Sequence, residues 1–247
     1  MLKKLTGVVT LTLHAAVPIV LIHFQGDDGA ALVFALMFLI ISFAAGVQLR
    51  YFIILFAAII LSIPLMWSFI LNEDQKNRLT VLFGADDSAL QTYGWQQYQG
   101  KLSIASGGIY GKGLFKGPRV EKELVPYQEN DFIFTVAGEE LGFAGCAAII
   151  LLFALILFRL IIISSRISDN AGKSICAGFF ALVGAQAMIN AGMVLGIFPV
   201  IGVALPFFSS GGSAAVSMFL GVGLVQSAVR YMAPSLRELS TKLTEGV

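Results

Sequence analysis

Residues 132–163 read FIFTVAGEELGFAGCAAIILLFALILFRLIII, and within this run of 32 residues only Glu139, Glu140 and Arg159 carry charge. A helix crosses the hydrocarbon of a membrane with about 20 mostly apolar residues. The run is therefore long enough to span a membrane and too long for one simple crossing. We expect its first turns, around Glu139 and Glu140, to lie at the outer interface or against other helices.

The whole chain shares this apolar character. It is 57% hydrophobic and 13% charged, with a mean hydropathy of +0.85, whereas a soluble domain is roughly one-quarter charged. We therefore expect an all-α integral membrane protein. Residues 1–247 form a single membrane domain, and residues 72–131 form a long extracytoplasmic loop between the third and fourth spans. Six stretches qualify as transmembrane helices: residues 6–23, 30–48, 51–71, 132–163, 174–197 and 213–233.

Basic residues in the short loops and tails predict the orientation of these spans. The short loops 24–29 and 198–212 contain no Lys or Arg, and positive residues are retained on the cytoplasmic side. Both termini are therefore expected in the cytoplasm. The seven basic residues of the loop 72–131 are tolerated because long loops are excused from this rule. The basic residues assigned to the cytoplasmic side are Lys3, Lys4, Arg50, Arg159, Arg166, Lys173, Arg230, Arg237 and Lys242.

The first apolar run has a second interpretation, a cleaved signal peptide, because Lys3 and Lys4 precede it. A retained helix is favoured, since the run is long and no small-residue cleavage site follows before Gln25. Cys146 and Cys176 both lie in expected spans and are interpreted as small apolar packing residues. No Cys/His cluster has metal-ligand spacing, so no dedicated metal site is expected.

The long loop contains a small, glycine-rich segment, residues 102–114, which reads LSIASGGIYGKGL. Glycines let the backbone approach a ligand closely and expose N–H groups that can hold an anion. Lys112 lies within the segment, and Lys116, Arg119 and Lys122 follow it. Such a loop at a membrane surface suits a phosphate or pyrophosphate headgroup, and a solvated basic loop without a ligand is the alternative. The spacing of a P-loop is absent.

Carboxylates beside hydrocarbon are costly and usually mark function. Asp131 directly precedes the apolar run. Low-dielectric surroundings disfavour the charged form and raise the pKa, which suits Asp131 to accept a proton, whereas nearby basic residues oppose that shift. Glu139 and Glu140 are neighbours on a helix and point about 100° apart. At most one of them lines a cavity shared with Asp131, and the other is expected to hold helices together.

The turn at residues 205–213, LPFFSSGGS, precedes the last span. Pro206 and the glycines 211–212 interrupt the helix, while Ser209, Ser210 and Ser213 offer caps and hydroxyl groups. Broken backbone at membrane depth is tolerated where it lines a cavity, and a capping turn without a ligand is an equal alternative. On the preceding span Gln186 and Asn190 share a face, which interhelical hydrogen bonding explains as well as a substrate does.

Four segments resemble motifs of the SEDS family (shape, elongation, division and sporulation), which includes RodA, FtsW and SpoVE. Residues 25–32, QGDDGAAL, resemble Q-P-D-x-G-T-A-L, with Gly26 and Asp28 departing from the pattern. Gly94, Trp95, Gln99 and residues 104–113 are similar to a RodA-like motif, which favours that branch. Pro126 and residues 130–142 resemble P-x-x-x-[NT]-D-F-I-F-x-x-x-x-E-E-L-G. Residues 190–196, Pro199, Gly202 and 205–213 resemble N-x-G-M-V-x-G-x-x-P-x-x-G-x-x-L-P-F-x-S-Y-G-G-S.

The resemblance implies a peptidoglycan glycosyltransferase of the bacterial cytoplasmic membrane that polymerises lipid II at the outer face. By this resemblance Asp131 is the catalytic residue, acting as a general base, and Glu123 is a second catalytic residue. It also implies a class B penicillin-binding transpeptidase as partner, and either basic residues or a divalent cation, Mg²⁺ or Mn²⁺, at the leaving pyrophosphate. No organic cofactor and no nucleic acid is expected. The residues expected to bind substrate are Gln99, Ser106, Gly107, Gly108, Lys112, Glu139, Glu140, Ser209 and Ser213.

Members of the family generally have ten spans, and this sequence begins where their fifth is expected. The chain then corresponds to the C-terminal part of the fold, as a fragment, a truncated product or a divergent short form. Two other functions remain open at this point. A lipid II flippase would use midplane polar residues and a broken helix, and an inactive scaffold would only hold the transpeptidase.

Overall fold

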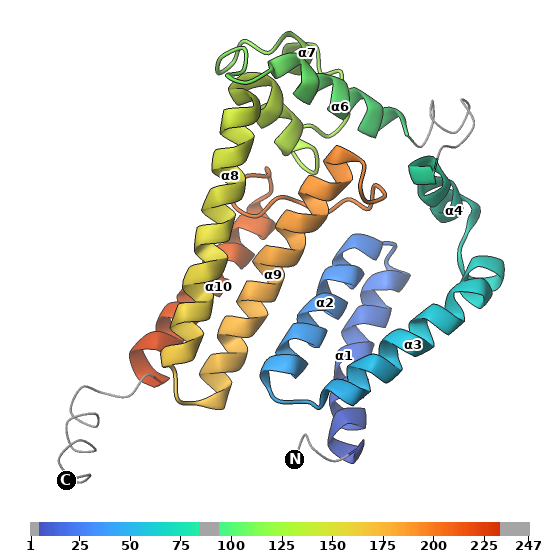
Figure 1. The fold of residues 1–247 in the computed structure, drawn as a ribbon, viewed down its shortest axis with the longest axis vertical. Coiled ribbons are helices and arrows are strands. Elements are labelled where there is room, and N and C mark those ends of the chain that lie inside the picture. Colours follow the sequence, from blue (N-terminus) through green and yellow to red (C-terminus); the bar gives the residue numbers. More distant parts are fainter. Residues whose placement is uncertain (1–4, 84–93, 233–247) are drawn as a thin grey trace.

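The computed structural model describes residues 5–83 and 94–232, and within these ranges the chain is helical and contains no strand (Figure 1). The expected all-α architecture is confirmed. Among the basic residues that predicted the orientation, Lys3, Lys4, Arg237 and Lys242 lie outside the described residues. The elements are α1 (Leu5–Phe24), α2 (Asp28–Ala44), α3 (Leu49–Leu65) with a π-turn (Met66–Ile70), α4 (Glu73–Thr80) with a 3₁₀ turn (Val81–Phe83), α6 (Trp95–Gly107), α7 (Pro118–Glu121), α8 (Ile133–Arg166), α9 (Asn170–Leu195) and α10 (Gly212–Met232).

Five of the described helical segments are long and apolar enough to cross a membrane: Thr6–Phe24, Leu49–Ile70, Ile133–Arg166, Asn170–Leu195 and Gly212–Arg230. The second expected span corresponds to α2, which has only 17 residues. That helix stops at Ala44 because Gly46 adopts a left-handed conformation (φ 84°) and turns the chain toward α3. The apolar runs thus predicted the positions of α1, α2, α3, α8, α9 and α10, while the ends of these helices depend on caps and turns.

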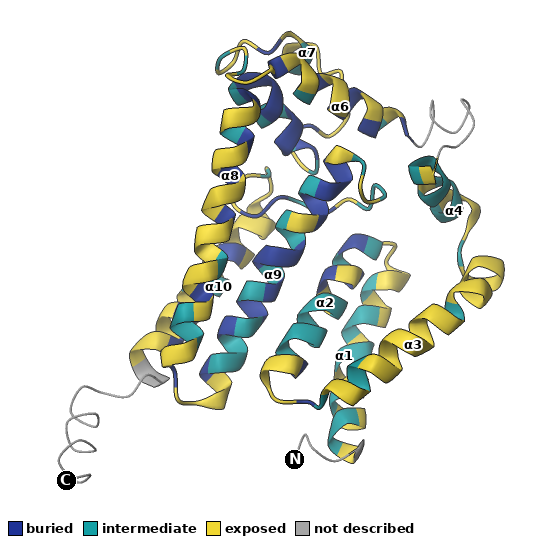
Figure 2. Ribbon diagram, in the orientation of Figure 1, coloured by how far each residue is buried: buried dark blue, intermediate teal, exposed yellow. Residues whose placement is uncertain are grey.

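Helix α9 is the centre of the bundle and packs against α2, α6, α8 and α10 (Figure 1). Asp169 caps its first turn by accepting hydrogen bonds from the backbone N–H groups of Ala171 and Gly172. Gly196, in the left-handed conformation (φ 75°), ends it. Figure 2 shows the buried residues concentrated on α9 and on the first turns of α8, whereas α3 has no buried residue. An apolar helix without buried residues is expected to face lipid.

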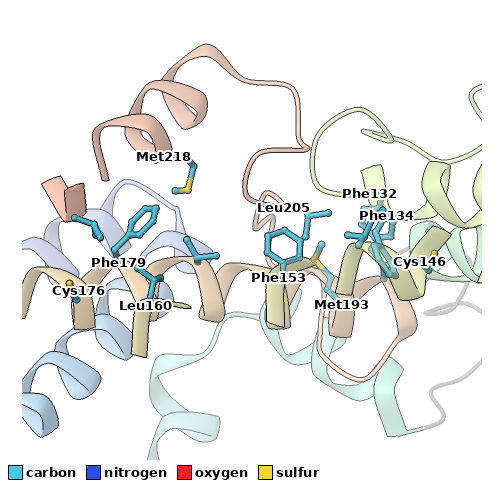
Figure 3. Close-up of a cluster of buried hydrophobic side chains, with 14 of the residues drawn as sticks. Phe132, Phe134, Cys146, Phe153, Leu160, Cys176, Phe179, Met193, Leu205 and Met218 are labelled. Carbon is cyan, nitrogen blue, oxygen red and sulfur yellow. The ribbon is translucent and has the colours of Figure 1, made fainter. Parts of the chain in front are cut away.

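The hydrophobic core runs along the contacts of α8, α9 and α10 (Figure 3). At one end of this core lie Phe132 and Phe134, next to the start of α8. Cys146 and Cys176 are both buried members of the core with free thiols, as the sequence predicted. Phe132 is fully buried, so it anchors the residue that precedes it, Asp131, against the bundle.

Different elements lie at the two ends of the bundle. The start of α1, the end of α10, and the α2–α3 and α8–α9 turns lie at one end, and α6 and α7 lie at the opposite end (Figure 1). The loop predicted from residues 72–131 is ordered where it is described, because it contains α4, α6 and α7. Of these helices, α6 and α7 pack against α8, whereas α4 lies apart from it (Figure 1).

Candidate active site

Asp131 lies at the head of α8, two residues before the helix begins, and its side chain is half-buried. Its backbone carbonyl accepts a hydrogen bond of 2.6 Å from the side-chain amide Nδ2 of Asn190 on α9. The same Nδ2 donates to the carbonyl of Val203 at 2.7 Å. One buried amide group thus joins α9, the start of α8 and the segment that connects α9 to α10.

This connecting segment, residues 197–211, covers the carboxylate. At Gly202 an added Cβ would lie 3.3 Å from Oδ2 of Asp131, so the backbone passes directly over the acid. Ser209 Oγ donates to the carbonyl of Asn130 at 2.7 Å, and Ser210 Oγ donates to the Asn130 side chain. The backbone N–H of Ser210 donates to the carbonyl of Glu129 at 2.8 Å. The serine turn therefore holds the residues immediately before Asp131.

A second carboxylate, Asp27, faces this site from the head of α2. Asp27 caps that helix through its Oδ1, which accepts from the N–H of Ala30 at 2.8 Å. The first turn of α2 reaches the connecting segment because residue 29 is glycine, where a side chain would overlap the carbonyl of Ile201. Burial, and secondly the negative charge of Asp27, raise the pKa of Asp131 above its ordinary value of 3.8. The sequence left the net direction open between burial and nearby basic residues, and in the structure burial is the larger effect on the pKa of Asp131.

Glu139 forms a separate cluster further along α8. The side chain is fully buried and accepts hydrogen bonds from the backbone N–H groups of Arg119 (3.0 Å) and Val120 (3.1 Å). Lys112 Nζ lies 3.5 Å from the same carboxylate. Glu139 lies six residues, or roughly 9 Å, along α8 from Ile133. Glu139 thus fastens the loop over α8, the tethering role that the sequence left to one of the two adjacent glutamates.

Other residues expected to bind substrate belong to this second cluster. Gln99 is buried, and its Oε1 accepts a hydrogen bond from the Arg119 guanidinium, whose Nε also donates to Ser103 Oγ at 3.0 Å. Ser106 Oγ donates to the carbonyl of Ser103 at 2.8 Å. Glu140 is buried, and no hydrogen bond to its carboxylate is present among the described residues. The cluster is an internal polar network between α6, α7 and α8, and a substrate-binding role for these residues stays a prediction.

The glycine-rich segment had two interpretations, an anion cradle and a solvated basic loop, and its hydrogen bonds do not favour the cradle. The N–H groups of Lys112 and Gly113 donate to the carbonyls of Glu139 (3.0 Å) and Glu140 (2.9 Å), and Gly111 donates to Gly107 (2.9 Å). These amides are already hydrogen-bonded within the protein and do not face a ligand. Glycine is required here because the loop backbone touches α8, so a Cβ at Gly107 or Gly111 would overlap helix carbonyls. Gly108 instead receives a bond from α8 at its carbonyl.

The same segment closes a break in α8. At Gly142 the helix has a left-handed, non-helical residue (φ 67°, ψ −164°). The N–H groups of Phe143 and Ala144, which lose their helical partners there, donate to the carbonyls of Gly108 (2.9 Å) and Ile109 (3.0 Å). The head of α8 is therefore a distinct segment fixed to the loop, as expected from a run too long for one crossing.

Two of the predicted site residues, Glu123 and Ser213, lie outside both the Asp131 site and the Glu139 cluster. Glu123 is exposed in the loop after α7 and has a left-handed backbone (φ 49°), a strained conformation for a residue with a side chain. No hydrogen bond to its carboxylate is present among the described residues. Ser213 is exposed in the first turn of α10. Their roles stay predictions.

An apolar cavity of about 350 Å³ lies behind the serine turn, between α2, α9 and α10. Ser209 borders both this cavity and the segment that carries Asp131. Most of the remaining lining is hydrocarbon, including Phe34, Met37 and Phe219. A cavity of this composition suits an apolar chain better than a sugar.

A divalent cation has limited protein ligands here. No group of three or more His, Cys, Asp or Glu side chains that could hold a metal occurs within residues 5–83 and 94–232. Mg²⁺ sites completed by substrate phosphates use only one or two carboxylates of the protein. The described residues thus fit only a site to which the substrate contributes ligands.

Two contributors to the site had weak signals in the sequence. The sequence indicated Asp27 only as part of the motif at residues 25–32. It explained Asn190 equally well by interhelical hydrogen bonding. Both interact with Asp131 across more than fifty residues of sequence, so their link to the acid depends on the packing of α2 and α9. Sequence spacing carries no information on that packing.

The fold and site define a polytopic membrane protein with a half-buried aspartate at the head of the longest helix described, α8. Residues 1–233 match the family described as "Cell cycle protein", FTSW_RODA_SPOVE, and the chain belongs to this family, as its motifs predicted.

The chain is 33% identical over 224 residues to "Peptidoglycan glycosyltransferase MrdB" of Escherichia coli (strain K12), an alignment that covers 91% of the chain and 60% of MrdB. It is 30% identical over 220 residues to "Probable peptidoglycan glycosyltransferase FtsW" of Geobacter metallireducens, with 89% and 58% covered. The similarity to MrdB fits the RodA-like branch. The chain thus spans about 60% of the length of these relatives.

A solved structure has the same arrangement of helices. It comes from the work titled "Structural coordination of polymerization and crosslinking by a peptidoglycan synthase complex", and the match has a TM-score of 0.77 and 27% sequence identity. The match covers 92% of this chain and 62% of the solved one.

Proposed function

We propose that the protein is a peptidoglycan glycosyltransferase that polymerises lipid II at the outer face of the bacterial cytoplasmic membrane. The observation that carries the proposal is the environment of Asp131: a carboxylate with a raised pKa, held at the head of a membrane-spanning helix by residues of α9 and the serine turn. A base of raised pKa accepts a proton more readily and is suited to general base catalysis. The names of the relatives support the same reaction class.

In the proposed reaction Asp131 takes the proton of the GlcNAc 4-hydroxyl of the acceptor. The hydroxyl oxygen forms a bond to the anomeric carbon of the donor MurNAc as the bond from that carbon to the pyrophosphate oxygen breaks. Polyprenyl pyrophosphate leaves with the electron pair, and the configuration is inverted. Basic residues or a divalent cation at the pyrophosphate would neutralise charge on the leaving group. The apolar cavity beside Ser209 is proposed to take hydrocarbon of a lipid-linked substrate.

Orientation and partner belong to the same proposal. The end of the molecule that carries α6 and α7 faces outward, and the α2–α3 and α8–α9 turns face the cytoplasm, in agreement with the basic residues Arg50, Arg166 and Lys173. A class B penicillin-binding transpeptidase is the proposed partner, supported by a similar structure whose title joins polymerisation and crosslinking.

The test is lipid II polymerisation by the purified full-length protein with its transpeptidase partner. Asp131→Asn keeps the size of the side chain and removes the base, so we expect glycan synthesis to fall on the order of 10²- to 10⁴-fold. Glu129→Gln, an exposed carboxylate two residues away, is the matched control and is expected to retain activity. Glycan synthesis by Asp131→Asn equal to that of the wild type would overturn the proposal. Outward movement of labelled lipid II that survives in this variant without glycan synthesis would favour a flippase.

A further inference from the structure

Asn190 is the only residue in the described part of the chain whose side chain donates a hydrogen bond to the backbone of Asp131. It lies on α9 with 0% of its surface exposed. Its Nδ2 is shared between the carbonyls of Asp131 and Val203, at 2.6 and 2.7 Å. A buried donor with two acceptors is satisfied only while both acceptors stay in place.

The two acceptors belong to the two segments that determine the surroundings of the acid. The first is the residue that carries the carboxylate, and the second is one residue beyond Gly202, whose backbone covers Oδ2. Separation of either segment from α9 would leave a buried polar group without a partner, which destabilises the separated arrangement. Asn190 therefore fixes both the position of Asp131 and the closeness of its cover.

The Oδ1 atom of Asn190 indicates that this side chain is not present for packing alone. Asn190 Oδ1 is buried and has no hydrogen-bond partner among the described residues. An apolar side chain of similar size would avoid that cost. The side chain thus retains an unpaired polar atom in the interior while its Nδ2 serves two backbone carbonyls.

We propose that Asn190 is a positioning residue for Asp131, which holds the acid in reach of its reaction partner and under the segment 197–211. This inference rests on the proposed glycosyltransferase function, because it assigns Asp131 a proton-transfer role. Asn190 acts through the Asp131 backbone and touches no reacting atom.

Gln97 provides a matched control. It is also buried, at 4% exposure, and its Nε2 donates to two backbone carbonyls, those of Met193 (2.8 Å) and Phe198 (2.7 Å). Gln97 joins α6 to the end of α9 without contacting Asp131. Asn190→Leu and Gln97→Leu therefore each remove two hydrogen bonds of the same kind, and only Asn190→Leu releases the acid.

The experiment compares both variants with the wild type in the full-length protein with its transpeptidase partner. Thermal unfolding is expected to show a similar loss of stability in the two variants. For lipid II polymerisation, Asn190→Leu is expected to lower kcat on the order of 10- to 100-fold with KM unchanged, since misplacement of a catalytic group by about 1 Å has effects of this size. Gln97→Leu is expected to stay near the wild-type kcat. Equal losses of kcat in both variants would overturn the proposal.

A second measurement tests the positioning role of Asn190 and does not require catalytic activity. Infrared difference spectra against Asp131→Asn report the titration of the Asp131 carboxyl in each background. In Asn190→Leu the titration is expected to move to lower pH, because a loosened cover admits water, and in Gln97→Leu it is expected to stay in place. An unchanged titration in Asn190→Leu would overturn the positioning role. Absence of glycan synthesis by the wild type would instead refute the proposed function and leave this measurement valid.

Discussion

Asp131 is a carboxylate whose oxygens receive no hydrogen bond from the described residues, although its backbone and its neighbour Asn130 are held at several points. The position of such an acid is fixed, but no hydrogen bond from the described residues stabilises its negative charge. Its raised pKa follows from burial and from Asp27. The same features that suit a base are expected to destabilise the folded protein.

Replacement of Asp131 by Asn is accordingly expected to raise thermal stability near neutral pH. A carboxyl whose pKa is raised in the folded state contributes stability below its unfolded pKa and loses that contribution as the pH rises through the folded value. The gain in Tm of Asp131→Asn over the wild type should therefore be largest near neutral pH and shrink as the pH falls toward the ordinary value of 3.8. A gain that grows on acidification would contradict this assignment.

Asp27 provides a test of the same electrostatics in catalysis. Asp27→Asn keeps a side chain that can cap α2 and removes the negative charge that raises the pKa of Asp131. The acidic limb of the pH dependence of kcat/KM should move to lower pH, since the base then loses its proton more readily. Asp28→Asn, in the same turn of α2, is the control and should leave the acidic limb in place. Coincident profiles for wild type and Asp27→Asn would exclude this role of Asp27.

Glu139 and Glu140 are expected to differ strongly in their effect on stability. Glu139 accepts two backbone hydrogen bonds and lies near Lys112, so Glu139→Ala should cost about 3 kcal/mol in the free energy of unfolding. Glu140→Gln replaces a buried carboxyl group that has no hydrogen bond in the described structure, and should be neutral or stabilising. Denaturant unfolding in detergent measures both. Equal costs would show that Glu139 does not fasten the loop.

At the scale of elements, the head of α8 depends on close contact with the glycine-rich loop. Gly111 has φ 76°, and a Cβ there would overlap the carbonyl of Glu140. Gly26 has a similar φ of 83°, but open space surrounds it. We expect Gly26→Ala to cost about 1–2 kcal/mol from backbone strain alone, and Gly111→Ala to cost about 1–3 kcal/mol more because of the overlap. Similar costs for the two substitutions would mean that the loop does not rest on the helix.

This loop shows where prediction from sequence ends. The apolar runs predicted the six long apolar helices, because a membrane span must satisfy its own backbone whatever its neighbours are. The glycines at 107, 111 and 113 also predicted a close backbone approach, but to a ligand. The structure places α8 there instead, and the amides of Lys112 and Gly113 bond to it. Sequence alone cannot show which donor meets which acceptor across about thirty residues. The sequence therefore predicted Asp131 as a site residue, but only part of the hydrogen bonding around it.

At the scale of the whole molecule, the proposed orientation is tested by cysteine labelling. The native cysteines are both buried, so their background should be low. Lys116→Cys lies in the exposed loop before α7, and Ser168→Cys lies in the exposed turn between α8 and α9. A membrane-impermeant maleimide added to intact spheroplasts should label Lys116→Cys and spare Ser168→Cys. The reverse pattern would place Asp131 on the cytoplasmic side.

Chemical rescue tests whether Asp131 supplies the base for glycan polymerisation. The measurement is the rate of lipid II polymerisation by Asp131→Ala in the full-length protein with its partner, with and without added formate. We expect glycan synthesis to be lost and formate, a small carboxylate able to enter the vacated space, to restore part of it. Synthesis at the wild-type rate by Asp131→Ala without formate would contradict this role of Asp131.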